Sequence, residues 1–501
     1  PEMSRGLGDV YKRQAYSCMT SASEFLSVSF YSSDITGTTY QPSEIVLQCK
    51  KVFKNIIAYD KFDFDGKKES MYALRPAFDT VADMIGKGKK VPESLLEIFA
   101  QNPEYSAKLD SLINAKDKVP FKIFDKKNAE KLFGKNLNIS ASQLEKFNLC
   151  RFSYFCNYGL NVRERQRAEI NPMQYGTIVH YILERFFGEY TKEECLSLEE
   201  DKFQKIVCAY LAEYAVKYFG EEQLESNSFT YRLKTILDNV MHLMKHIMEE
   251  LSQSEFFVAD CELKIGEDIP SYTIVLPDGH KIAVCGSVDR VDIMQRADIT
   301  YLRIIDYKTG TKQFKLSDIL YGINLQMLLY LHSIEASGGD KYGEIVPAGI
   351  LYMPATVPYI SSDSLKSIDK LPDELNKKLK MNGLLLKDTE IIHGMDKTDV
   401  ATYIPVKIKA GEPVSSTSLA TLAEFGKIFK KVDMLIAEMG KNIYNGNIEA
   451  KPLKGGHDSC EYCPYDSVCA YRQSNPITCF SVDNKTVIEE ITNEINGKEE
   501  E

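Results

Sequence analysis

At 501 residues with a net charge of −11, the chain is too long for one compact core, and typical domain sizes predict two to four domains. Hydrophobic residues make up 44% and charged residues 27%, and no apolar run is long enough to span a bilayer. The composition therefore predicts a cytoplasmic protein without a membrane partner. The acidic balance argues against a protein that simply coats DNA, although basic clusters at 163–167 and 308–315 can still line a local groove.

The beginning of the chain differs in character from the rest. We interpret residues 1–14, PEMSRGLGDVYKRQ, as a non-native, adapter-derived segment, and we expect the natural protein to begin upstream. From 15 to 135, strand-like pieces such as Phe25 to Phe30 alternate with amphipathic helical stretches at 92–100 and 105–115. The sequence has no G-x-x-x-x-G-K-[ST] phosphate loop, so it predicts no ATP site.

Helices are expected next. Ser140 or Ser142 is the predicted N-cap of a helix, with Glu145 three residues beyond Ser142. A second helix is predicted from Gly176 through Phe187. More helices fill 197–254, where apolar residues recur at three- and four-residue spacing.

The periodicity then changes to that of strands. Five strands are predicted, at 256–264, 271–276, 281–294, 301–307 and 345–352. Asp278-Gly279 predicts a hairpin turn, and a helix at 316–336 separates the last two strands, which we expect to be parallel. The order indicates an α/β fold with a mixed central sheet flanked by helices.

The remaining segments are less regular. Residues 356–412 are polar and Lys-rich, and we interpret them as an insertion or mobile lid. A long helix is predicted from Ser416 to Lys441. The charged C-terminal tail, residues 476–501, is expected to fray.

A carboxylate and a lysine end the fourth predicted strand. Asp306 and Lys308 share one face of it, because successive side chains on a strand alternate. Asp289, on the preceding hairpin strand, is expected to face Asp306 at about 5 Å. Two such carboxylates repel unless a cation lies between them, and oxygen ligands favour Mg²⁺ or Mn²⁺. With Lys308 orienting a water or stabilising charge on phosphorus, the set predicts phosphodiester hydrolysis. Taken alone, Asp306 and Lys308 are also consistent with a surface ion pair that contributes at most about 1 kcal/mol.

These motifs resemble a known family. GSVDRVD at 286–292, IIDYKTG at 304–310 and the pair Gln326 and Tyr330 are similar to the PD-(D/E)XK nuclease core of RecB-like exonucleases. The resemblance implies that Asp289 and Asp306 bind the metal, that Lys308 assists the nucleophile, and that Gln326 and Tyr330 position DNA or the lysine. It also implies that His180, in a G-T-x-x-H motif, is a further metal ligand.

A cysteine array follows near the C-terminus. Cys460, Cys463 and Cys469 form a C-x2-C-x5-C pattern, which predicts a metal site that needs a fourth ligand. Cys150 is our choice, and Cys156 is its rival. Spacing alone does not separate zinc from an iron-sulfur cluster.

The same resemblance extends to this array. AddB-type subunits of the AddAB helicase-nuclease, and the smaller Cas4 nucleases, join one cysteine before the nuclease core to three after it around a [4Fe-4S] cluster. Their first cysteine follows a helix that begins S-x-S-x-L-E, as residues 140–145 do here, with Arg151 where the family has proline. The resemblance thus implies a structural [4Fe-4S] cluster on Cys150, Cys460, Cys463 and Cys469, closing a loop of about 310 residues.

The expected organisation is therefore the end of a helicase-like region at 15–135 and a nuclease domain at 136–475. The resemblance implies a metal-dependent DNA exonuclease subunit that acts on double-strand ends in recombinational repair, with an AddA-like helicase-nuclease partner. Two other hypotheses stay open: a catalytically inactive DNA-binding scaffold, and a stand-alone exonuclease of the Cas4 or RecB-like kind.

Overall fold

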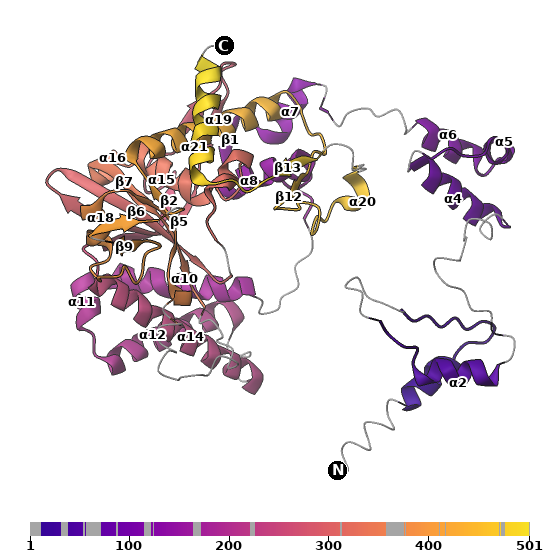
Figure 1. The fold of residues 1–501 in the computed structure, drawn as a ribbon, viewed down its shortest axis with the longest axis horizontal. Coiled ribbons are helices and arrows are strands. Elements are labelled where there is room, and N and C mark those ends of the chain that lie inside the picture. The colour runs from indigo at the N-terminus through magenta and orange to yellow at the C-terminus, as the bar shows by residue number, and fades with distance from the viewer. Residues whose placement is uncertain are drawn as a thin grey trace. The chain divides into compact units, whose positions relative to one another are not determined.

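The structure is a computed structural model of the chain. It describes all residues except 1–11, 32–38, 54–55, 57–71, 87–88, 115–121, 124, 164–171, 221–225, 311–312, 357–374, 376, 410, 416, 470, 472–475 and 500–501. Most of the predicted adapter segment, and most of both basic clusters named above, lie outside the described residues. The chain divides into two compact units, Pro1–Lys118 and Val119–Glu501, which are described separately (Figure 1).

The N-terminal unit is helical. Its helices are α2 (Glu44–Val52), α4 (Leu74–Gly86), α5 (Glu93–Gln101) and α6 (Ser106–Asn114). The last two confirm the helices predicted at 92–100 and 105–115. Phe78, Phe99 and Tyr105 pack their rings together in a small core. The strand expected at Phe25 to Phe30 is wrong, because these residues are exposed and have no paired neighbour there.

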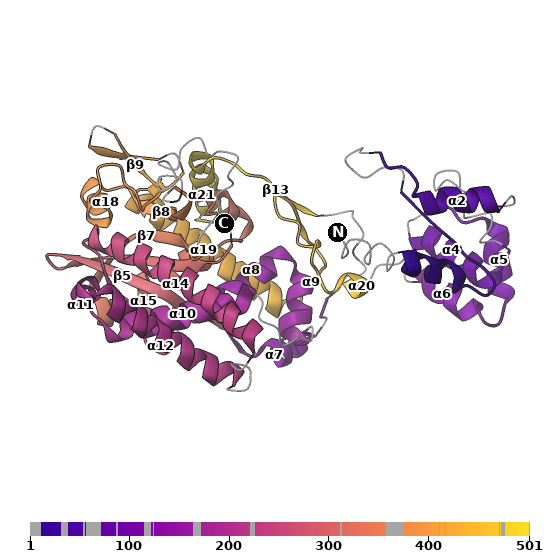
Figure 2. The ribbon, with the colours of Figure 1, turned by 90° about the horizontal axis from the view of Figure 1, so that it is seen from below.

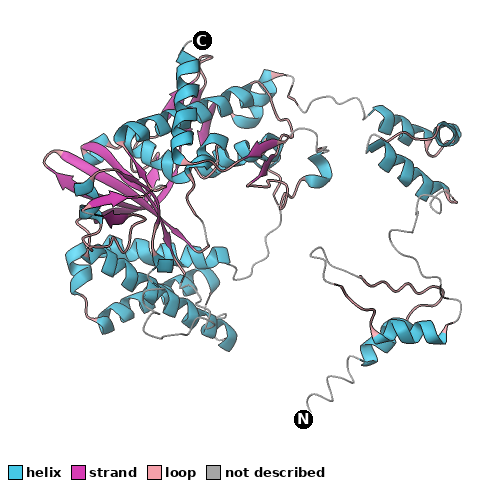
Figure 3. Ribbon diagram, in the orientation of Figure 1, coloured by secondary structure: helices cyan, strands magenta, loops and turns pink. Residues whose placement is uncertain are grey.

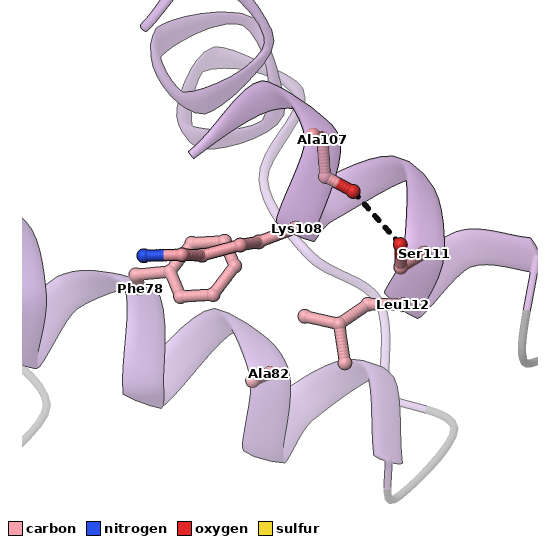
Figure 4. Close-up of a pocket in the computed structure, with 6 residues that line it drawn as sticks. All are labelled: Phe78, Ala82, Ala107, Lys108, Ser111 and Leu112. Carbon is pink, nitrogen blue, oxygen red and sulfur yellow. Dashed lines mark hydrogen bonds between the residues drawn. The ribbon is translucent and has the colours of Figure 1, made fainter. Parts of the chain in front are cut away.

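Helices α4 and α6 border an open pocket of about 540 Å³ (Figure 4). It is lined by Phe78, Ala82, Ala107, Lys108, Ser111 and Leu112. The Ser111 hydroxyl already donates a hydrogen bond to the carbonyl of Ala107 at 2.9 Å. Since no carboxylate, histidine or cysteine lines it, this pocket offers no side-chain ligand for a metal.

A six-stranded mixed sheet organises the second unit (Figure 3). Its strands, in spatial order, are β11 (Leu419–Ala420), β8 (Asn382–Leu386), β7 (Glu344–Pro354), β6 (Ile299–Lys308), β5 (Gly286–Arg296) and β2 (Phe257–Ile265). Strand β5 runs antiparallel to both β2 and β6, whereas β6 and β7 are parallel. The mixed sheet and the parallel pair confirm the predicted architecture.

The strand predicted at 281–294 is divided. Its first part, β4 (Lys281–Val284), pairs with β1 (Asn136–Ile139) and β3 (Thr273–Val275) in a separate sheet, with the predicted hairpin between β3 and β4. The second part is β5. The break falls at Gly286, whose φ is 158° and where an added Cβ would overlap the Tyr330 hydroxyl. Glycine therefore leaves room for Tyr330 where the chain passes from one sheet to the other.

Helices cover both faces of the large sheet (Figures 1 and 2). One side carries α10 (Pro172–Glu189), α11 (Lys192–Ser197), α12 (Glu200–Phe219) and α14 (Asn227–Ser252). The other carries α15 (Gln326–Ser337), α19 (Leu422–Tyr444) and α21 (Asn484–Glu499), with α7 (Lys126–Phe133) and α8 (Ala141–Leu149) close to α19. The helix predicted at 316–336 is interrupted, because a 3-10 turn (Leu316–Tyr321) ends at left-handed Gly322 before α15 begins.

Two predictions about the irregular segments are wrong over their described parts. Within 356–412, β8 belongs to the central sheet and α18 (Thr389–Met395) buries Ile391 and Ile392, so this part is core and not a lid. Residues 357–374 of that segment lie outside the described residues. The expected frayed tail instead forms α21, whose Val487 and Ile491 are fully buried against the core.

No helix in the described parts of the chain combines the length and the apolar character that a bilayer-spanning segment requires.

Candidate active site

Three carboxylates lie side by side on neighbouring strands. Cys261 and Leu263 of β2 pair with Arg290 and Val288 of β5, so Glu262 lies beside Asp289. Arg290 pairs with Ile305 of β6, so the next residues along each strand, Asp289 and Asp306, also lie beside each other. The sheet thus brings Glu262, Asp289 and Asp306 together in one row.

Helix α10 adds a histidine to this row. Nδ1 of His180 lies 2.9 Å from Oε1 of Glu262 and 3.6 Å from Oδ1 of Asp289. The Ser287 hydroxyl donates to the other Glu262 oxygen at 2.7 Å, and the Tyr307 amide donates to Asp289 at 3.0 Å. One donor atom from each of His180, Glu262 and Asp289 lies within 4.8 Å of the other two, a spacing that fits one metal ion.

Asp306 and Lys308 are in direct contact. Nζ of Lys308 lies 2.5 Å from Oδ2 of Asp306, and the Gln326 amide donates to Oδ1 at 3.1 Å. Asp306 is 2% exposed, while the lysine side chain keeps 26% of its surface. The two residues therefore do not form a surface ion pair, because the carboxylate is buried and only Lys308 reaches solvent.

Gln326 and Tyr330 have different neighbours. Both belong to α15, one turn apart, and so project from the same side of the helix. Gln326 contacts Asp306, whereas the Tyr330 ring is buried against Gly286, where β5 begins. Burial raises the pKa of Tyr330 to about 12, so its hydroxyl stays protonated near neutral pH.

The electrostatics of the row favour a cation. Burial raises the pKa of Asp289, the charge of Asp306 raises it further, and it reaches about 7. Burial alone would lower the pKa of His180, but its hydrogen bond to Glu262 and the nearby carboxylates outweigh this and raise it. Protonated groups thus balance the clustered negative charge, and a divalent ion would take over that role.

The opposite face of the same strands is held by buried charges. Arg290 and Arg303 are fully buried and both bind Asp292 and Glu250, at N···O distances of 2.5 to 3.1 Å. Arg290 also stacks near Phe187 of α10, the helix that carries His180. Breaking such a pair leaves an uncompensated buried charge, so this network resists relative movement of α10, α14 and the site strands.

A second cluster gathers cysteines. Cys150, Cys156, Cys463 and Cys469 pack with Phe152 and Tyr465. Cys460 is close as well, since the pKa of Tyr471 is raised by burial and by both Cys460 and Cys150. Burial raises the pKa of the Cys150 and Cys156 thiols, and no described cysteine forms a disulfide. The structure brings both rivals, Cys150 and Cys156, to the array.

Glu262 is the site residue that our sequence reasoning missed. It lies within a predicted strand, but its place beside Asp289 depends on the register of β2, which shifts between Val258 and Asp260. Its backbone is also unusual, with φ of 50° inside the strand. A carboxylate in a half-buried strand next to the Asp289 strand was the available signal.

Comparison with known proteins agrees with this geometry. Residues 138–470 match the PD-(D/E)XK nuclease superfamily. The chain is 31% identical over 487 residues to the B subunit of the ATP-dependent helicase/deoxyribonuclease of Clostridium acetobutylicum, covering 91% of this chain and 41% of that protein. The corresponding proteins of a Thermoanaerobacter species (31%, 91% and 41%) and of Clostridium kluyveri (30%, 97% and 44%) are similarly related. The chain spans less than half the length of these relatives.

The match covers the whole region that contains the carboxylate row, Lys308 and the cysteine array. Together with the mixed, helix-flanked sheet, it shows that the chain belongs to the PD-(D/E)XK nuclease superfamily.

Proposed function

We propose that the chain cleaves DNA by metal-dependent phosphodiester hydrolysis, as the nuclease part of a helicase-nuclease subunit. The observation that carries this proposal is the convergence of His180, Glu262 and Asp289 within 4.8 Å of one another, next to the buried pair of Asp306 and Lys308. Their donors are hard oxygens and one imidazole, which suit Mg²⁺ and, with the histidine, Mn²⁺.

Each residue has a definite task in this scheme. His180, Glu262, Asp289 and Asp306 hold the divalent ion, which when bound supplies an activated water and charge stabilisation. Lys308, partly exposed beside Asp306, orients the attacking water or stabilises negative charge as it builds on phosphorus. Gln326 fixes Asp306 through its amide. Tyr330 supports the start of β5, where its ring packs against Gly286.

For the cysteine array we propose a structural [4Fe-4S] cluster on Cys150, Cys460, Cys463 and Cys469. A tetrahedral zinc ion would hold its thiolates about 3.8 Å apart. In the described part of the chain, no three cysteine sulfurs lie within 4.8 Å of one another. This wider spacing supports a multi-iron cluster. The group would tie residue 150 to residue 460 and stabilise the fold by several kcal/mol in order of magnitude.

The biological context is a proposal from the relatives' names. These relatives are named as subunits of an ATP-dependent helicase/deoxyribonuclease. We infer that this chain acts as an exonuclease on double-strand DNA ends in recombinational repair in the cytoplasm, alongside an AddA-like helicase-nuclease subunit. Residues 15–135 would then be the end of a helicase-like region.

Strand cleavage with separately labelled DNA ends tests the proposal. The full-length protein, purified anaerobically with its partner subunit, should release nucleotides from one strand with Mg²⁺ or Mn²⁺. Asp306→Ala should abolish cleavage of that strand. Asp298→Ala, an exposed carboxylate in the β5–β6 turn, is the matched control and should cut normally. Cleavage of both strands by Asp306→Ala would instead support a catalytically inactive scaffold.

A further inference from the structure

A carboxylate outside the metal site holds the helix that carries Gln326. Oε1 of Glu145, in α8, accepts hydrogen bonds from the backbone amides of Leu325 at 2.8 Å and Gln326 at 3.3 Å. These amides begin α15, where the first N–H groups of a helix have no partner within the helix. A carboxylate there also interacts favourably with the helix dipole. Glu145 therefore caps α15 from another helix 180 residues away.

A second bond ties the two helices together. Asn148, three residues after Glu145 and on the same side of α8, donates to the carbonyl of Gly322 at 3.1 Å. Gly322 adopts a φ of 70°, and an added Cβ would overlap the Asn148 side chain. Helix α8 thus holds both ends of the junction 322–326, through which the chain enters α15.

Helix α8 is itself well anchored. Ser140 and Gln143 form a reciprocal capping box at its start, and Leu144 is fully buried. The motif at 140–145 that the sequence singled out therefore has two parts: Ser140 and Gln143 cap α8, while Glu145 caps α15.

The cap matters because of what α15 presents at that point. Gln326 is the first residue of α15, and its side-chain amide donates to Asp306 at 3.1 Å while its backbone amide donates to Glu145. Any shift of this first turn would move the Gln326 amide away from a carboxylate that is 2% exposed and also binds Lys308.

We propose that Glu145 is a positioning residue for the nuclease site, acting through Gln326 to fix the orientation of Asp306. The inference rests on the proposed nuclease function. Glu145 touches neither the metal ligands' donor atoms nor Lys308 in any described hydrogen bond or ion pair, so its effect must pass through α15.

A double-mutant cycle on the full-length complex tests this. Glu145→Ala and Gln326→Ala should each lower kcat for strand cleavage by about tenfold, and the double variant should lose about tenfold rather than about a hundredfold. Glu145→Gln keeps an acceptor oxygen and should retain most of the activity. Mn²⁺ titration by electron paramagnetic resonance, without DNA, should show the same loss of affinity in Glu145→Ala and Gln326→Ala.

Asp388→Ala is the matched control. Asp388 caps α18 by accepting the amides of Glu390 and Ile391, and α18 carries no site residue. It should lower the melting temperature about as much as Glu145→Ala does, with unchanged kcat and Mn²⁺ affinity. If the losses from Glu145→Ala and Gln326→Ala multiply while the wild type cleaves DNA, this inference is wrong and the proposed function stands. A wild type that neither cleaves DNA nor binds Mn²⁺ would instead refute the proposed function.

Discussion

The Nδ1 atom of His180 lies 2.9 Å from Oε1 of Glu262, although 82 residues separate them in the chain. The contact joins α10 to β2, at one end of the carboxylate row. It also places Glu262 between the histidine and the Ser287 hydroxyl, so both of its oxygens are oriented. An oriented, half-buried carboxylate beside two other acids has the arrangement of a metal ligand rather than of a surface charge.

We therefore predict that Glu262→Gln lowers both Mn²⁺ affinity and the cleavage rate by at least about 100-fold, because outer partners of metal ligands already cost 10- to 100-fold when removed. Calorimetric Mn²⁺ titration and single-turnover cleavage measure the two losses. Glu267→Gln, a nearby exposed turn residue, is the control and should match the wild type. Normal Mn²⁺ affinity in Glu262→Gln would remove this residue from the site.

Clustered carboxylates should also destabilise the metal-free fold. Asp289 is 10% exposed and lies beside both Glu262 and Asp306, so Asp289→Asn removes repulsion. Without divalent ions, we expect its melting temperature to rise by about 2–4 °C. With saturating Mn²⁺, the wild type should gain stability and Asp289→Asn should not. Differential scanning calorimetry measures both, and a lower metal-free melting temperature would contradict the repulsion argument.

The parts of the site that lie on one hairpin were predictable from the sequence. The alternation of side chains on a strand and the short β5–β6 connection place Asp289 and Asp306 together without knowledge of the rest. Glu262 was not predictable, because its position depends on a register shift in β2 and on a left-handed backbone. A one-residue change of register reverses the face of every side chain on a strand.

The fold shows the same division. The order of strands and the parallel pairing of β6 with β7 followed from periodicity. The role of β8 did not, because its short apolar run, Gly383 to Leu386, lies within Lys-rich sequence that suggested an exposed segment. Helix α21 did carry a signal, since Val487 and Ile491 are four residues apart and pack against the core. Charge composition outweighed that spacing in our interpretation.

A buried histidine makes stability depend on pH. His332 of α15 is 8% exposed, with Nε2 3.0 Å from Asp433 and Nδ1 3.6 Å from Glu335. Burial alone would lower the pKa of His332, but these two carboxylates raise it to about 9. A raised pKa means that the stabilisation is complete below pH 6.5 and is lost as the pH rises through 9.

We predict that His332→Gln costs about 2–3 kcal/mol of unfolding free energy at pH 6 and that this difference shrinks towards zero by pH 10. Denaturant unfolding of both proteins across that range gives the difference directly, and it cancels groups that titrate in both. His393→Gln, an exposed histidine on α18, should show no such dependence. A constant difference at all pH values would mean that packing on Phe429, and not charge, explains the effect of His332.

The cysteine cluster offers a choice between two ligands. Cys150 ends α8 and Cys156 lies six residues later, and both pack in the same cluster with Cys463 and Cys469. We expect Cys150→Ser to lower the iron content and the melting temperature, because it opens the constraint between the start and end of the nuclease unit. Cys156→Ser should keep its iron and lose only packing.

Because Cys150 directly follows the helix that contains Glu145, loss of the cluster should also reach the nuclease site. Anaerobic removal of iron by chelation should weaken Mn²⁺ binding in the wild type, since a displaced α8 releases the start of α15 and with it Gln326. The same treatment should have little further effect in Gln326→Ala, where that route is already cut. Iron analysis and Mn²⁺ titration on the same samples provide the measurement, with Cys208→Ser, an exposed cysteine of α12, as the control. Equal weakening in the wild type and in Gln326→Ala would show that the cluster acts on the whole fold rather than through α8.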